Sequence, residues 1–139
     1  MKSRIYIIED EIHMHPRNAI LKALDGCDLT IALSTDEGKK NFDPKANYDL
    51  VIIDHDMYGW PDPNYHPNSG YAFLEWLTNQ AFKLPKNFVL HTWNYDWRDK
   101  QVTLLKKVGI TPSLMPFGDE YVRWLANRGW TKGVSRGSR

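Results

Sequence analysis

The chain has 139 residues, of which 42% are hydrophobic, so it can bury one core but has no room for two ordinary domains. Its 18 basic and 17 acidic residues leave a formal net charge of +1, which excludes an overall field that attracts nucleic acid or membranes. No apolar run approaches the roughly 18 residues of a membrane span, and the first residues do not resemble a signal peptide. We therefore expect a cytoplasmic protein with no membrane partner.

Five short apolar runs, separated by helical patterns, predict the strands of a parallel sheet with helices on both faces. The runs are Ile5–Ile8, Leu29–Leu33, Leu50–Ile53, Phe88–Leu90 and the weaker Ser113–Met115. The alternation of strands and helices from end to end indicates an α/β fold.

Two helices are expected in the first half of the chain. Pro16 can begin the first because its missing N–H is not needed there, and Gly26 can end it. Ser34 and Glu37 form the pattern of a capping box, which predicts a short second helix.

Three further helices are expected in the second half. Ser69 can cap a helix that runs to about Ala81, and Asn94 or Asp96 can cap the next one. The last spans Asp119–Arg128. The residues predicted to face inward are Phe73, Leu74 and Leu77, then Val102, Leu105 and Val108, then Val122 and Leu125.

One loop and the C-terminal end do not fit this regular pattern. Residues 57–69 hold three prolines and cannot form a regular helix, and a loop of this size is usually functional, so it is a candidate contact for a protein partner. Residues 130–139 are basic and rich in Gly and Ser, which predicts a flexible tail. We therefore expect one domain over residues 1–129.

Polar residues follow three of the predicted strands at the point where each strand ends. They are Glu9-Asp10-Glu11, Asp54-His55-Asp56 and His91-Thr92-Trp93-Asn94. In an open parallel sheet ligands bind outside the carboxyl ends of the strands, so these segments predict a shared site.

Carboxylates that converge on one cleft repel each other unless a cation lies between them. Glu9, Asp10 and Asp54 are therefore the predicted ligands of a divalent metal, most simply Mg²⁺ or Mn²⁺, which would also take a phosphate oxygen. His55 and His91 are candidates for a general acid or base or for metal ligation, although a lone histidine is more often structural.

The pattern resembles the receiver domains of bacterial response regulators over nearly the whole chain, to about Gly129. The resemblance implies a flavodoxin-like, doubly wound sheet of five parallel strands in the order 2-1-3-4-5. The residues that match the family are Glu9 and Asp10 as its acidic pair, Asp54 as its phosphoacceptor, and Thr92. Met115 stands where the family has a Lys before a Pro.

The sequence is also similar to the cyclic-phosphate processing receiver-like domains. The matching motifs are Asp54-His55-Asp56, Gly70-Tyr71 with Trp76, and His91-Thr92-Trp93-Asn94 with Arg98 downstream. This similarity implies a metal-dependent phosphoesterase for 2′,3′-cyclic phosphates of nucleotides or RNA ends. Its site would consist of catalytic His55, His91 and Asp56, substrate-binding Thr92, Asn94 and Arg98, and the metal ligands Glu9, Asp10 and Asp54.

Two other functions stay open at this point. The chain could be a non-catalytic receiver-like module for signalling or protein docking, since the family's Lys is absent. It could also be a structural protein with no metal site. An enzyme turns over its substrate many times, whereas a module acquires at most one phosphoryl group.

Overall fold

The computed structural model describes residues 3–13, 18–57, 64–92, 94–114 and 123. Its strands are β1 (Arg4–Ile8), β2 (Asp28–Ala32), β3 (Leu50–Ile53), β4 (Phe88–Leu90) and β5 (Ser113–Leu114). They form one parallel sheet in the order β2-β1-β3-β4-β5, which confirms the expected topology.

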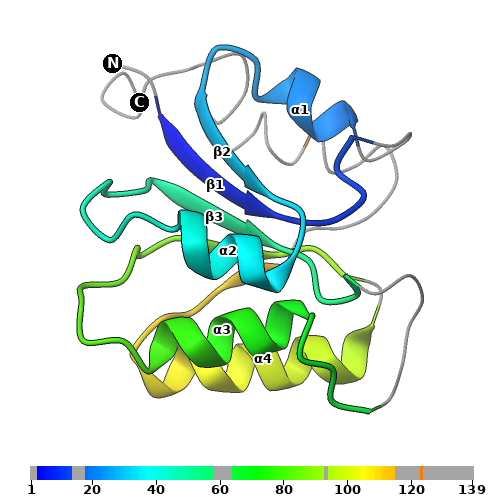
Figure 1. The fold of residues 1–139 in the computed structure, drawn as a ribbon, viewed down its shortest axis with the longest axis vertical. Helices are drawn as coiled ribbons and strands as arrows, with labels where there is room; N and C mark the ends of the chain where they lie inside the picture. Colours follow the sequence, from blue (N-terminus) through cyan, green and yellow to red (C-terminus); the bar gives the residue numbers. More distant parts are fainter. Residues whose placement is uncertain (1–2, 14–17, 58–63, 93, 115–122, 124–139) are drawn as a thin grey trace.

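Helices cover both faces of this sheet. The helices are α1 (Ala19–Ala23), α2 (Thr35–Asn41), α3 (Gly70–Thr78) and α4 (Tyr95–Lys107). In Figure 1, α2, α3 and α4 lie on one side of the sheet and α1 lies on the other, which is the doubly wound arrangement. Within the described ranges, no helix combines the length and the apolar composition needed to cross a membrane.

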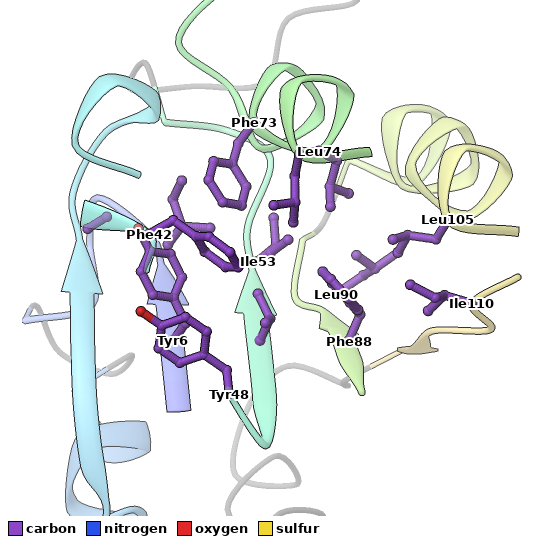
Figure 2. Packing of buried hydrophobic residues seen from close by; sticks show 14 of the residues in the cluster. Tyr6, Phe42, Tyr48, Ile53, Phe73, Leu74, Phe88, Leu90, Leu105 and Ile110 are labelled. Atoms are coloured by element: carbon purple, nitrogen blue, oxygen red, sulfur yellow. The ribbon is translucent and has the colours of Figure 1, made fainter. Parts of the chain in front are cut away.

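Strand β1 supplies both halves of the core, because successive side chains of a strand point to opposite faces. Ile5 and Ile7 pack on the α1 side with Ile20, in one buried cluster. Tyr6 and Ile8 belong to the larger cluster under α2, α3 and α4, part of which is shown in Figure 2. These four side chains are completely buried, whereas Arg4 at the start of β1 is exposed, so the strand is packed on both faces beyond its first residue.

Several aromatic rings pack around Tyr6 in the larger cluster. The Tyr6 ring centroid lies 5.2 Å from that of Phe42, 5.1 Å from that of Tyr48 and 6.1 Å from that of Phe73. The buried Tyr6 hydroxyl donates a hydrogen bond of 2.7 Å to the Gly38 carbonyl of α2. Strand β1 is thereby tied to α2 by packing and by a polar contact.

The predicted cap of α2 is confirmed. The Ser34 hydroxyl accepts a hydrogen bond from the Glu37 N–H at 3.1 Å. The Glu37 carboxylate accepts in return from the Leu33 N–H at 3.1 Å, one residue further back than in a standard capping box.

The predicted cap of α3 is also confirmed. Of the two candidate caps for α4, Asn94 and Asp96, the structure shows Asn94. The Ser69 hydroxyl accepts from the Ala72 N–H. For α4 the N-cap is Asn94, whose side-chain oxygen accepts from the Trp97 N–H at 3.5 Å. Asp96 lies inside the first turn instead.

Helix α3 is shorter than expected, because it ends at Thr78 rather than near Ala81. The side-chain amides of Asn79 and Gln80 donate to the carbonyls of Glu75 and Trp76, at 2.9 Å each. At the end of the helix these side-chain bonds add to the backbone bond of 3.2 Å that the Asn79 N–H donates to the Trp76 carbonyl.

The prediction that Val108 faces inward from α4 is wrong, since its side chain is 41% exposed. The buried residues of α4 are Trp97, Gln101 and Leu105, which are spaced by four residues on one helix face. Val102 packs against the core only partly. Val108 is the C-cap, where the backbone has left the helix.

Several predicted features lie outside the described residues. They are Pro16, residues 58–63 of the long loop, Trp93, Met115, all of the last helix except Arg123, and the tail 130–139.

Candidate functional site

The carboxyl ends of β1, β3 and β4 meet at one edge of the sheet. The register pairs Ile8 with Ile53, and the backbone bonds continue past both strands. The Asp54 N–H donates to the Ile8 carbonyl at 3.1 Å, and the His91 N–H donates to the Ile53 carbonyl at 2.8 Å. Glu9, Asp54 and His91 therefore occupy the next row, with Asp54 in the middle.

Glu9 and His91 form a buried pair across this row. The Glu9 Oε1 atom lies 3.7 Å from His91 Nδ1, and the two residues are 1% and 0% exposed. Because β3 lies between β1 and β4, their backbones are about 10 Å apart, a gap that only long side chains can bridge. The Glu9 carboxylate thus lies against a neighbouring imidazole rather than open solvent.

Asp56 is held by the residues that follow β4. Its Oδ2 atom accepts from the Thr92 hydroxyl at 3.2 Å, and its Oδ1 atom accepts from the Asn94 side-chain amide at 3.2 Å. The Asn94 N–H donates to the Thr92 oxygen at 3.1 Å. Since Asn94 is also the N-cap of α4, this network ties the end of β3 to the first turn of that helix.

His55 is enclosed between α3 and α4. Its side chain is completely buried, and its ring stacks on Trp97 with centroids 5.0 Å apart and planes 12° from parallel. The Nδ1 atom accepts a hydrogen bond from the Tyr71 N–H at 3.3 Å. The ring therefore packs and accepts a bond inside the protein.

The electrostatic surroundings keep His55 neutral. The pKa of His55 is lowered to about 4, chiefly by burial and to a smaller extent by His66 and Lys100, while the nearby Asp56 carboxylate acts in the opposite direction. At neutral pH the imidazole is therefore uncharged, in agreement with the acceptor role of Nδ1.

Gly70 sets the distance between α3 and the Asp54 segment. Its N–H donates to the His55 carbonyl at 2.9 Å. A Cβ atom at this position would lie 1.6 Å from the Asp54 carbonyl oxygen, so only glycine fits. The Gly-Tyr pair at the start of this helix therefore has a steric reason to begin with glycine.

The predicted metal ligands do not fit a magnesium ion as they are arranged. Among the described residues, no three His, Cys, Asp or Glu side chains are grouped so that they could hold a metal. Glu9 lies against His91, and Asp54 is only 1% exposed. Mg²⁺ keeps several of its waters when it binds to proteins, and such a hydrated ion needs open space beside its carboxylates.

Arg98 was expected to bind substrate, but its guanidinium lies over the Tyr95 ring, 4.4 Å from the centroid. Among the described residues it pairs with none of the acids at the edge of the sheet. Sequence reasoning missed two buried α4 residues behind the site, Trp97 and Gln101. The signal for them was their position three and seven residues after the cap Asn94, on one helix face.

Aromatic residues gather beside the site, in a group that we call the aromatic face. It comprises Tyr65, Tyr71, Trp97 and Lys100. The ring centroids of Tyr65 and Tyr71 are 6.3 Å apart, those of Tyr71 and Trp97 are 4.9 Å apart, and Lys100 Nζ lies 3.9 Å from the Trp97 centroid. Tyr65 is 53% exposed and belongs to the described part of the loop 57–69.

Comparison with known proteins identified relatives by structure. No family model and no curated protein matched the chain. NtrX from Brucella abortus matches with a TM-score of 0.59 and 19% identity, over 94% of this chain and 27% of NtrX. The chain thus spans well under two thirds of NtrX.

Two shorter proteins match over most of their length. The non-phosphorylated receiver domain of HemR from Leptospira biflexa has a TM-score of 0.59 and 20% identity, over 91% of this chain and 93% of that domain's chain. The response regulator TrrA from Thermotoga maritima, in complex with Mg²⁺-BeF, has a TM-score of 0.55 and 19% identity, over 91% and 97%. These identities establish the fold of receiver domains and nothing finer.

The comparisons correct the predicted function. The solved structures that match are receiver domains of response regulators rather than phosphoesterases. The expectation of a metal-dependent phosphoesterase is therefore wrong. The receiver-like resemblance is confirmed at the level of the fold, whereas no comparison supports the cyclic-phosphate processing family or an RNA end as ligand.

Proposed function

We propose that this chain is a non-catalytic receiver-like module that acts by docking to a partner protein. The observation that carries the proposal is the complete burial of both histidines at the edge of the sheet. His91 lies against Glu9, and His55 is stacked on Trp97. A general acid or base must reach the substrate within hydrogen-bond distance, and neither ring is exposed to do so.

The aromatic face is the proposed docking surface. Tyrosine and tryptophan are enriched at protein interfaces, because a large rigid ring buries much area at little cost in conformational entropy. Tyr65 is 53% exposed and Lys100 is exposed, whereas Trp97 is buried, so a partner would contact this face mainly through Tyr65 and Lys100. The Lys100 ammonium over Trp97 adds a charge that a partner can recognise.

The residues at the edge of the sheet position this surface. His55 packs directly under Trp97, and Asp56 holds the N-cap of α4 through Asn94. We call Glu9, Asp10 and Asp54 the polar edge. In this proposal they lie beside the residues that hold the aromatic face in place. The side chains that were predicted to be catalytic therefore have a positioning role.

Photo-crosslinking in the source organism tests the docking surface. A photoreactive benzoylphenylalanine in place of Tyr65 is expected to crosslink to one partner protein. The matched control places the same group at Lys86, which is exposed in the loop before β4 at the opposite edge of the sheet. No product of the same size is expected from that position.

The charge reversal Lys100→Glu is a second test of the docking surface. It alters the aromatic face without touching the core, so the chain should fold, and the Tyr65 crosslink should be lost. Equal products from the Tyr65 and Lys86 positions would contradict docking through this face, as would a product unaffected by Lys100→Glu.

A further inference from the structure

We infer that this module has a second site, at the amino ends of β3 and β4, which binds a small anion with an apolar ring. The site is a pocket of about 180 Å³ at the opposite edge of the sheet from Asp54. Its lining comes from the loop between α2 and β3 and from the loop between α3 and β4, through residues 42–44, 47–49 and 83–87. The inference is independent of the proposed docking function.

The two loops that form the pocket are bonded to each other and to the sheet. The Asn87 side-chain amide donates to the Asp49 carbonyl at 3.1 Å, and the Val51 N–H of β3 donates to the Asn87 carbonyl at 2.9 Å. Each loop also contributes a proline to the lining, Pro44 and Pro85, and the ring of a proline fixes its φ angle. A ligand therefore does not have to order these loops, which lowers the entropic cost of binding.

Part of the pocket lining is apolar and belongs to the core. Phe42 and Tyr48 are only 7% and 9% exposed, and their ring centroids are 5.1 Å apart in the cluster shown in Figure 2. The half-buried Leu84 lines the pocket from the other loop. Pockets for drug-sized ligands measure about 300–1,000 Å³, so this smaller pocket suits a molecule with a single ring and one acid group.

The charged residues of the pocket differ in what they already bind. The Asp43 carboxylate accepts from the backbone N–H two residues later, and the Asp49 carboxylate accepts from the Arg4 N–H, at 2.9 Å each. Lys83 and Lys86 are exposed and form no hydrogen bond or ion pair within the described ranges. Because the carboxylates are engaged and the ammonium groups are not, the pocket offers charged donors, which recognise a carboxylate or a phosphate.

The test is a titration of the ¹⁵N-labelled full chain with benzoate and, separately, with phenyl phosphate. At least one of them should give saturable shifts of the amide resonances of residues 42–49 and 83–87, and the tighter of the two identifies the acid group that the pocket prefers. Benzylammonium has the same ring with the opposite charge, and acetate has no ring, so neither should shift these resonances. Absence of saturable shifts with both anions, or equal shifts with benzylammonium or acetate, would overturn the inference.

Two double variants distinguish the pocket from weak binding elsewhere on the surface. Lys83→Gln combined with Lys86→Gln should weaken binding of the preferred anion about fivefold, because each exposed ion pair contributes little and two are removed. The matched control combines Lys106→Gln with Lys107→Gln, which removes the same charge from the last turn of α4, outside the pocket. All four lysines are exposed, so both variants should fold. The control should bind as the wild type does, and an equal loss of affinity in both variants would contradict a site in this pocket.

Discussion

Gly70 offers the sharpest steric test among the single residues. In Gly70→Ala the added methyl would lie 1.6 Å from the Asp54 carbonyl oxygen, so α3 must move away from the strand end. We expect a loss of about 2–4 kcal/mol in the free energy of unfolding, measured by urea denaturation.

Gly109→Ala is the matched control for this substitution. Gly109 has a φ of +83°, but no atom lies within 4 Å of the position of an added Cβ. Gly109→Ala should therefore lower the free energy of unfolding by about 1–2 kcal/mol, through backbone strain alone. If Gly109→Ala costs as much as Gly70→Ala, the close approach of α3 to Asp54 is not what requires glycine.

Because His55 is buried, we expect the free energy of unfolding to fall in acid. Because burial lowers its pKa from 6.5 to about 4, the folded state favours the neutral ring. This contribution is fully present above pH 6.5 and is lost as the pH falls through 4, to a total of roughly 3 kcal/mol. The variant His55→Asn keeps an acceptor for the Tyr71 N–H but does not titrate, so its unfolding free energy should depend less on pH over this range.

The control for His55→Asn is His13→Gln, because His13 is exposed. Urea denaturation at pH 7, 5.5 and 4 should give His13→Gln the same pH dependence as the wild type. A His55→Asn variant that loses as much stability in acid as the wild type would show that another group is responsible.

At the scale of the secondary-structure elements, α4 carries an unusual buried residue. Gln101 is completely buried, and neither polar atom of its amide has a hydrogen-bond partner among the described residues. An unsatisfied buried polar group costs about 1–3 kcal/mol. We therefore expect Gln101→Met, which has a similar length and no amide, to raise the free energy of unfolding by about 1 kcal/mol or more.

Gln80→Met serves as the matched control at the end of α3. The Gln80 amide donates to the Trp76 carbonyl at 2.9 Å, so its removal should leave stability unchanged or slightly lower. Destabilisation by Gln101→Met, measured by urea denaturation, would mean that its amide is satisfied in solution.

The sequence predicted the elements better than the contacts between them. Ser34 and Ser69 were identified as caps because a cap needs only a local pattern. The end of α3 was missed, because the side-chain bonds of Asn79 and Gln80 have no such pattern. Val108 was misplaced, because the apolar spacing did not show that the backbone leaves the helix there.

The candidate site was predicted in its position but not in its chemistry. Glu9, Asp54 and His91 do meet at one edge, as the strand order requires. The order of residues alone does not distinguish a carboxylate that faces solvent from one that lies against a histidine two strands away. That difference depends on whether the Glu9 side chain is long enough to contact His91 across β3, and this contact is visible only in the folded sheet.

For the whole molecule, we predict that no phosphoester is turned over. A panel of cyclic and linear phosphoesters with Mg²⁺, Mn²⁺ or Zn²⁺ should show no hydrolysis above that of the variant Asp54→Asn. The reason is that both histidines are buried and Glu9 is engaged with His91. Multiple turnovers that depend on Asp54 would contradict a non-catalytic module.

The receiver fold by itself does not decide how the module works, because one fold supports many functions. We assign docking to the aromatic face and a supporting role to the polar edge. The most direct test is the yield of the photo-crosslink from position 65, measured in the variants Asp54→Asn and Lys100→Glu. We predict an unchanged crosslink yield with Asp54→Asn and a lost crosslink with Lys100→Glu. A crosslink that disappears with Asp54→Asn and survives Lys100→Glu would contradict docking through the aromatic face.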